Sequence, residues 1–237
     1  MKKFLLAISL GLGIIIFPAL LPTQDRKEQD GPIVLVGGGN VPNEAVRWFK
    51  ERVKRGGYIV VTYDFDYSSR WITLLSSLDI RFVLPENFDK VELAKIGGII
   101  IDGGDQWKYV NRLSGEAIQK AHEMGIPILG TSAGAMILGE HYFTAEKGSI
   151  GSDEIDQVEK ICLGKKFVTI RHLQGTLVDT HYTERNRQKR LNVFIERSGA
   201  NYGLGIDEHT ALCIDERKFQ VFGPGQVEVV SPNMATR

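Results

Sequence analysis

Cysteine and histidine are scarce in this chain, and neither sign of charge is in excess. The chain has two cysteines and five histidines among 237 residues, and 29 basic residues balance 29 acidic ones. Neither a Cys-x-x-Cys nor a His-x-x-x-His pair occurs, so the sequence offers no metal-ligand cluster and we expect no metal and no cofactor. The zero net charge gives no support for nucleic acid or an anionic membrane surface as a partner.

Both cysteines lie in apolar stretches of the sequence. Cys162 stands between Ile161 and Leu163, and Cys213 between Leu212 and Ile214. We expect two buried free thiols from these settings. A disulfide between them remains an alternative, because an exported protein folds where thiols can pair.

The N-terminus has the layout of an export signal. A short positive start at residues 1–3 precedes an uncharged, mostly apolar run over residues 4–21. We expect residues 1–22 to be a signal peptide, which predicts a secreted or periplasmic protein. The alternative is a membrane-anchored protein outside the cytoplasm, because the run reaches the lower length limit of a spanning helix. Residues 23–31 would then be a linker, and residues 32–237 one domain with a substantial core.

The first half of that domain alternates between apolar strands and helices. Strands are expected at residues 32–36, 58–63, 80–84, 98–101 and 126–129, with helices at residues 42–54, 68–78, 91–96 and 114–124. This alternation predicts an α/β fold with a parallel-rich, doubly wound sheet and helices on both faces. Ligands of such sheets bind at the carboxyl ends of the strands. We therefore expect Gly37–Gly39, Gly103–Gly104 and Ser132, which follow strands, to face one crevice.

The second half is less regular. Strands are expected at residues 167–170 and 177–178, and a helix with a strongly basic start at residues 184–195. The two last strands, at residues 205–214 and 219–230, are expected to form an antiparallel pair.

The stretch Gly130-Thr131-Ser132-Ala133-Gly134 separates a strand from a segment that should be helical through Phe143. Gly-x-Ser-x-Gly in this setting is the pattern of a nucleophile elbow, whose sharp turn holds the serine in a strained backbone conformation. Glycines are needed there because the neighbouring strand and helix leave no space for a Cβ. An ordinary glycine-rich turn is the alternative, and the flanking strand and helix favour the nucleophile.

A serine nucleophile needs a histidine that takes its proton and an acid that orients the histidine. His181 is the favoured base because it ends an expected strand among polar residues. For the acid, Asp153 and Glu154 lie between Ser132 and His181, in a chain order that serves triads on parallel sheets. The competing residues are His172 and His209 for the base, and Glu146, Asp179 and Glu208 for the acid.

Two further stretches bear on the same chemistry. Gly103-Gly104 is either a tight turn or the source of a second oxyanion N–H beside that of Ala133. The basic stretch over residues 185–190 is either a solvated helix face or holds a substrate carboxylate through at least one arginine.

Four motifs then follow one another along residues 32–215. They are Gly-Gly-Asp-Gln at 103–106, Gly-Thr-Ser-Ala-Gly-Ala at 130–135, Asp-Thr-His-Tyr-Thr-Glu-Arg-Asn-Arg-Gln-Lys-Arg-Leu at 179–191, and Gly-Ile-Asp-Glu-His-Thr-Ala-Leu at 205–212. Together they resemble cyanophycinase and its relatives, serine peptidases that include the aspartyl dipeptidases. The resemblance implies a fold like that of class I glutamine amidotransferases, with serine in place of cysteine, for a catalytic domain over residues 32–237.

The resemblance also implies roles for particular residues. Ser132 would be the nucleophile and His181 the base, with Gly104 and Ala133 as oxyanion donors. An alignment of Ser152–Ile155 with the family's acid selects Glu154 as the third triad member. The residues implied to line the substrate pocket, with the arginines holding an aspartyl carboxylate, are Gln106, Asp179, Arg185 and Arg190.

The function expected from the resemblance is that of an exported serine peptidase that hydrolyses cyanophycin to β-aspartyl-arginine dipeptides. Thr180 stands where the family pattern carries glutamine, a departure that bears on the substrate. The alternatives are an aspartyl peptidase like dipeptidase E, a non-catalytic binding protein like the glutamine amidotransferases, and an α/β-hydrolase esterase, whose early His-Gly-Gly loop is missing. The expected partners are an aspartyl-containing peptide and a second copy in a homodimer, with the N-terminus as an anchor if it is not cleaved.

Overall fold

The computed structural model describes residues 30–62, 69–77, 79–85, 88–216 and 218–232. The expected signal peptide at residues 1–22 lies outside these residues. Across the described residues, no helix combines the length and the hydrophobicity that crossing a lipid bilayer requires.

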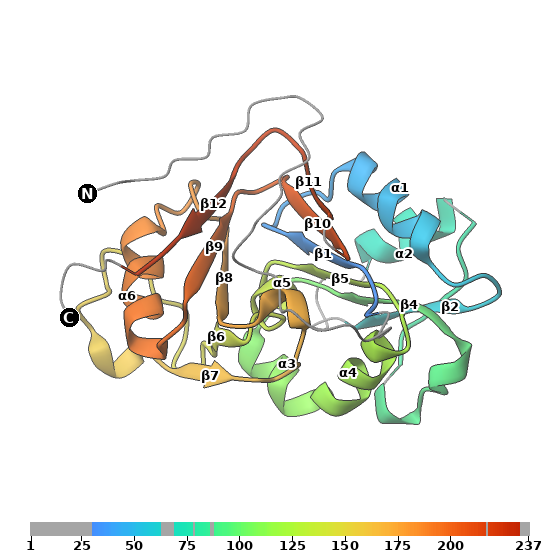
Figure 1. Ribbon diagram of the computed structural model, residues 1–237, viewed down its shortest axis with the longest axis horizontal. Helices are drawn as coiled ribbons and strands as arrows, with labels where there is room; N and C mark the ends of the chain where they lie inside the picture. The colour runs from blue at the N-terminus through green and yellow to red at the C-terminus, as the bar shows by residue number, and fades with distance from the viewer. Residues whose placement is uncertain (1–29, 63–68, 78, 86–87, 217, 233–237) are drawn as a thin grey trace.

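A seven-stranded sheet forms the first layer of the fold (Figure 1), in the order β11-β10-β1-β5-β4-β2-β3. Its strands are β1 (Ile33–Val36), β2 (Tyr58–Thr62), β3 (Phe82–Val83), β4 (Ile96–Ile101), β5 (Ile128–Thr131), β10 (Ala211–Asp215) and β11 (Lys218–Phe222). The neighbouring strands β1, β5, β4, β2 and β3 run parallel, whereas β10 and β11 are antiparallel to their neighbours. The expected parallel-rich α/β sheet is therefore confirmed.

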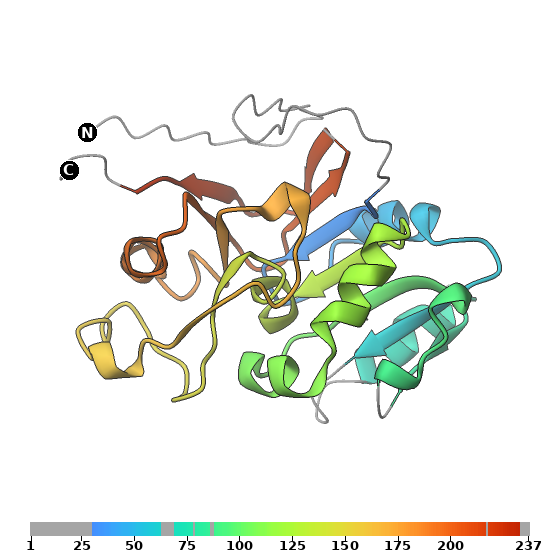
Figure 2. The ribbon, with the colours of Figure 1, turned by 60° about the horizontal axis from the view of Figure 1, so that its bottom comes forward.

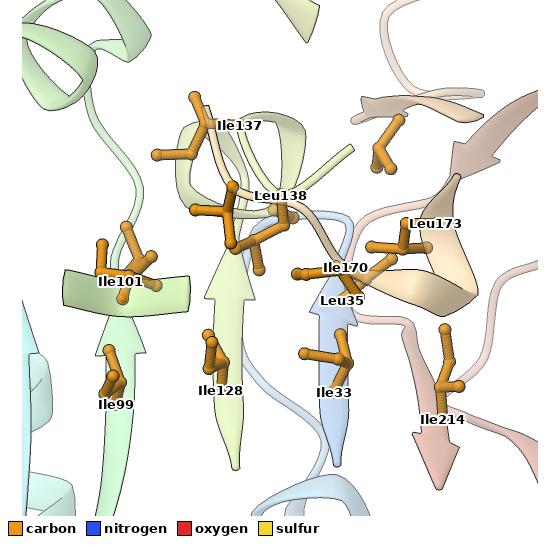
Figure 3. Packing of buried hydrophobic residues seen from close by; sticks show 14 of the residues in the cluster. Ile33, Leu35, Ile99, Ile101, Ile128, Ile137, Leu138, Ile170, Leu173 and Ile214 are labelled. Carbon is orange, nitrogen blue, oxygen red and sulfur yellow. The ribbon is translucent and has the colours of Figure 1, made fainter. Parts of the chain in front are cut away.

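Helices cover both faces of this sheet. On one face α1 (Asn43–Arg52) and α2 (Ser69–Ser77) pack in a cluster with Val34 and Val36 of β1. On the other face Ile33 and Leu35 belong to a cluster with α3 (Gln106–Arg112) and α4 (Gly115–Glu123). Figure 3 shows Ile33 of β1 level with Ile128 of β5 and Ile99 of β4. Because both faces are covered, the strands are continuous apolar runs rather than alternating ones.

A second, five-stranded sheet lies beside the first, in the order β12-β9-β8-β6-β7. Its strands are β6 (His141–Phe143), β7 (Leu163–Lys165), β8 (Thr176–Thr180), β9 (Tyr202–Ile206) and β12 (Val227–Val230). Helix α6 (Gln188–Ser198) packs on it through Leu191, Phe194 and Ile195. Figure 2 shows the orange ribbon of this helix nearly end-on, beside the strands of the second sheet. The remaining helices are short: α5 (Ala133–Met136) and the 3-10 turns Phe88–Lys90, Leu93–Lys95, Val158–Lys160 and Arg171–Leu173.

Three expectations for the second half are wrong in detail. The helix after Ser132 ends at Met136 instead of Phe143, because the chain turns back at Gly139 and residues 141–143 enter the second sheet as β6. Residues 167–170 form no strand. The basic helix begins at Gln188 rather than at residue 184, since residues 182–186 form a turn.

The late antiparallel pair exists, but it is divided between the two sheets. The expected strand 205–214 is broken by a loop at residues 207–210, in which His209 has a left-handed φ of 56°. The expected strand 219–230 is broken at Gly223, whose φ is 109°. As a result β10 pairs with β11 in the first sheet, while β9 pairs with β12 in the second.

Candidate active site

Ser132 lies in the sharp turn between β5 and α5, with φ 50° and ψ −116°. Side chains other than glycine rarely adopt positive φ, and such strained residues cluster at functional sites. A Cβ at Gly130 would come within 2.6 Å of the carbonyl oxygen of Gly134, and one at Gly134 would collide with that of Ile101. The sequence therefore folds into the expected elbow, and the two glycines are required by close backbone approach.

His181 follows β8 in the second sheet, and it meets Ser132 of the first sheet. The Ser132 hydroxyl lies 2.7 Å from Nε2 of His181, a hydrogen-bond distance. The backbone N–H of His181 donates to the carbonyl oxygen of Gly37 at 2.7 Å, and its φ is 50°. A Cβ at Gly38 would collide with the imidazole ring, so the glycine run after β1 makes room for this histidine. The structure thus brings together the expected nucleophile and the expected base.

The acid beside His181 is Glu208, at 2.5 Å between Oε1 and Nδ1. The expected partner, Glu154, is not there: its carboxylate accepts the N–H of Gly151 and lies 3.4 Å from Nζ of Lys160. The expectation for Glu154 is therefore corrected. The physical reason is that β8 and β9 are adjacent parallel strands, whose last residues, Thr180 and Ile206, are register partners. Residues that follow these strands therefore meet at one edge of the sheet.

The protonation states at the site follow from this geometry. Burial lowers the pKa of His181, against the opposing effect of its hydrogen bond to Glu208, and the charge of Arg185 lowers it further. The hydrogen bond to His181 lowers the pKa of Glu208. The ionised Glu208 thus accepts the Nδ1–H of a neutral His181, which leaves Nε2 free to accept the proton of Ser132.

The loop after β4 borders the serine. A Cβ at Gly103 would lie 3.9 Å from the Ser132 hydroxyl, and the Gly103 N–H donates to Asp102 Oδ1 at 2.7 Å. The next residues lead into α3, where Gln106 is buried and its Nε2 lies 3.1 Å from Sδ of Met136 on α5. The structure therefore places Gly104 on the loop beside the elbow, and Gln106 at the start of α3, in contact with Met136 of α5.

Asp179 and Arg190 do not line an open pocket, contrary to expectation. Both are buried, and Arg190 binds both carboxylate oxygens of Asp179 through Nε, at 2.9 Å, and Nη2, at 2.5 Å. Arg187 adds a third contact, at 3.2 Å from Oδ1 of Asp179. Arg190 also lies over the rings of Phe143 and Phe194. This buried ion pair joins β8 to α6. Of the two arginines that were expected to hold an aspartyl carboxylate, Arg185 is exposed to solvent and Arg190 is buried.

Cys162 and Cys213 are free thiols, so the alternative of a disulfide is excluded. Burial raises the pKa of the Cys213 thiol, which keeps it protonated and unreactive. Among the residues that the structure describes, no group of three or more histidine, cysteine, aspartate or glutamate side chains is arranged to hold a metal ion.

The hydroxyl of the elbow serine is hydrogen-bonded to a histidine, which in turn contacts a glutamate, and this is the geometry that a nucleophile, a base and an acid need. The sequence profile described as Peptidase family S51 matches residues 76–222, and the chain belongs to this family. It is thus a peptidase by family, and the matched segment contains Ser132, His181 and Glu208.

Curated relatives of the chain are named cyanophycinase. The protein from Synechococcus elongatus is 34% identical over 146 residues, which cover 59% of this chain and 43% of the relative. The protein from Nostoc sp. is 29% identical over 153 residues, which cover 62% of this chain and 49% of the relative. The match thus spans about half the length of these curated relatives.

Two solved structures share the fold. A peptidase from an acI-B1 Actinobacterium aligns with a TM-score of 0.62 and 16% identity, over 88% of this chain and 97% of that one. A putative peptidase E protein from Listeria monocytogenes EGD-e aligns with a TM-score of 0.56 and 16% identity, over 83% and 100%. At this identity the likeness concerns the fold alone.

Proposed function

We propose that the chain is a serine-type peptidase that cuts aspartyl-containing peptides. The observation that carries the proposal is the continuous line of contacts from the Ser132 hydroxyl through the His181 ring to the Glu208 carboxylate. A non-catalytic binding protein would have no need to hold a serine and a histidine in left-handed backbone conformations at hydrogen-bond distance.

In the proposed reaction Ser132 Oγ attacks the peptide carbonyl carbon while its proton passes to Nε2 of His181. Glu208 stabilises the imidazolium that forms. The N–H groups of Gly104 and Ala133 stabilise the oxyanion, and the C–N bond breaks as His181 gives its proton to the leaving amine. Water then attacks the acyl-enzyme, gives a proton to His181, and restores the Ser132 hydroxyl as the product acid leaves.

The proposed substrate is cyanophycin, a poly-aspartate chain whose side-chain carboxyls carry arginine. The names of the curated relatives support this proposal. The exposed Arg185, whose charge acts on both His181 and Glu208, is suited to hold an aspartyl carboxylate near the reacting atoms.

A second candidate is an aspartyl dipeptidase, whose small substrate carries no arginine arm. The buried state of Asp179 favours it, because both oxygens of this carboxylate are already bound to arginines and none is left for a substrate guanidinium. The two candidates share Ser132, His181 and Glu208 and differ only in what fills the substrate pocket.

The deciding experiment incubates purified full-length protein with insoluble cyanophycin and, separately, with α-aspartyl dipeptides. Clearing of the suspension with release of β-aspartyl-arginine, detected by mass spectrometry, supports cyanophycin hydrolysis. Cleavage of the dipeptides alone supports the second candidate. Ser132→Ala is the matched control, and a wild-type protein that a fluorophosphonate does not label would contradict a serine peptidase of either kind.

Export from the cytoplasm is proposed from the sequence of residues 1–22 alone. Intact mass of the protein from its native cells tests it. A signal peptide predicts a mature N-terminus between about residues 20 and 31. An anchor predicts the full-length chain in the membrane fraction, and soluble full-length chain in the cytoplasm contradicts both.

A further inference from the structure

The peptide group that joins Gly103 to Gly104 carries the N–H that would stabilise the oxyanion. Both residues beside this peptide are glycines, so no Cβ restricts its rotation. Gly104 has a φ of 142°, in the region that favours glycine. If the peptide turned over, its carbonyl oxygen would take the place of its N–H and would repel an oxyanion. The N–H can therefore serve the reaction only if another group fixes the peptide.

The hydroxyl of Tyr109 on α3 supplies such a contact. It donates a 2.8 Å hydrogen bond to the carbonyl oxygen of Gly103. None of the described peptide bonds is cis, and the C=O and N–H of a trans peptide point to opposite sides. Binding of the Gly103 carbonyl thus directs the N–H of Gly104 away from Tyr109. Tyr109 is only 3% exposed, within a hydrophobic cluster of the first sheet, so the donor itself is held in place.

The groups on either side of this peptide have other partners. The N–H of Gly103 donates to Asp102 Oδ1 at 2.7 Å, and the side chain of Asp105 caps α3. Within the part of the chain that the structure describes, the N–H of Gly104 donates to no protein atom, and Gly104 is exposed. A Cβ at Gly103 would lie 3.4 Å from that of Ser132. An unpaired N–H thus lies on the loop next to the nucleophile.

We propose that Tyr109 is a positioning residue that holds the Gly103–Gly104 peptide with its N–H toward the oxyanion formed at Ser132. This inference rests on the proposed serine-peptidase function. The hydroxyl of Tyr109 acts through the backbone and touches no reacting atom. Its hydrogen bond also polarises the peptide, which makes the N–H of Gly104 a stronger donor. Both effects matter most when negative charge develops on the substrate oxygen, so they concern the transition state more than substrate binding.

Tyr109→Phe removes the hydroxyl and keeps the ring in its cluster. The probe is a fluorophosphonate, whose phosphoryl oxygen takes the place of the oxyanion when Ser132 attacks. The outright loss of an oxyanion donor costs about a hundred- to a thousandfold, so a donor that is only loosened should cost roughly tenfold in the maximal labelling rate. The probe concentration that gives half of this rate should not change. Tyr142→Phe, which removes another hydroxyl from the same cluster, is the matched control and should label at the wild-type rate.

A double-mutant cycle shows whether Tyr109 acts on the oxyanion or on the histidine and its acid. Oxyanion stabilisation persists when a triad member is lost. Tyr109→Phe should therefore cause the same fold-loss in a Glu208→Gln protein as in the wild type. It should also leave the acid limb of the labelling rate at its wild-type pH. Incorporation of 4-aminophenylalanine at position 109 replaces the hydroxyl with an N–H donor and should restore most of the rate.

Four results would overturn the inference alone. They are an unchanged labelling rate in Tyr109→Phe, an equal loss in Tyr142→Phe, a loss that disappears in the Glu208→Gln protein, and a loss that 4-aminophenylalanine does not repair. Urea unfolding shows whether each variant is folded during the assay, and the repair by an N–H donor separates the hydrogen bond from the packing of the ring. A wild-type protein that the fluorophosphonate does not label would overturn the proposed function together with this inference.

Discussion

The N–H of Thr183 donates a 3.0 Å hydrogen bond to Oδ1 of the buried Asp207. The other oxygen of Asp207 accepts the N–H of Gln226 at 2.9 Å. One carboxylate therefore joins the turn after His181 to the loop that presents Glu208. We expect Asp207→Asn to lower kcat about tenfold and stability by about 1–3 kcal/mol, because an amide cannot accept both N–H groups. Enzyme kinetics and urea unfolding measure the two effects, and the exposed Asp156→Asn is the control.

Ser132→Ala and His181→Ala should each lower kcat by on the order of a millionfold, the scale seen when a triad loses its nucleophile or base. The double variant should lose little more than either single variant, because the two side chains act as one unit. Single-turnover measurements on the three proteins check this. A double variant that is far slower than both singles would contradict the pairing.

Glu208→Gln should lower kcat by about ten-thousandfold with little change in KM, as the loss of a triad carboxylate does elsewhere. Glu154→Gln should leave kcat nearly unchanged, because its carboxylate contacts Gly151 and Lys160 and not His181. The two variants remove the same charge, so each controls for the other. If their effects are exchanged, the acid is Glu154 after all.

Activity should fall on acidification, because His181 must be neutral to accept the proton of Ser132. Its pKa is held below the ordinary value of 6.5 by burial and by Arg185, so the acid limb of kcat/KM should lie below about pH 6.5. Arg185→Ala removes a positive charge and should raise this pKa, which moves the limb to higher pH. Arg185→Lys keeps the charge and is the control, and an unchanged limb in Arg185→Ala would contradict the assignment.

The main effect of Arg190→Leu should be a loss of stability and not a loss of substrate binding. It leaves the buried carboxylate of Asp179 with Arg187 as its remaining charged partner, and breaking such a pair costs about 3–5 kcal/mol. Arg185→Leu, on the exposed part of the same stretch, should change the free energy of unfolding by less than about 0.5 kcal/mol. Chemical denaturation distinguishes the two variants, and equal stabilities would restore Arg190 as a candidate substrate contact.

The sequence predicted the parts of the molecule that depend on local pattern. The apolar runs of β1 and β4 are continuous, and Gly130 and Gly134, between an expected strand and an expected helix, indicate the elbow around Ser132. Glu208 could not be selected in this way, because its role depends on the pairing of β8 with β9, which no local pattern encodes. Its place within the motif at residues 205–212 is the signal that could have found it.

Asp179 was misassigned for a related reason. The resemblance to the family implied a place in the substrate pocket for this carboxylate, which lies near the base and close in sequence to three arginines. Its burial depends on the packing of α6 against β8, which brings Arg187 and Arg190 onto it from one side. Composition could therefore predict that these charges interact, but not that they interact with one another rather than with a ligand.

The division of the late antiparallel pair has a consequence for the maturation of the protein. Ser132 is carried by the first sheet and His181 by the second, and the loop at residues 207–210 crosses between them with Glu208. A chain in which only one sheet has formed contains a hydroxyl without a base, or a base without a hydroxyl. Under the proposed mechanism, activity therefore requires that both sheets have docked, so a newly made chain gains it only when its tertiary structure is complete.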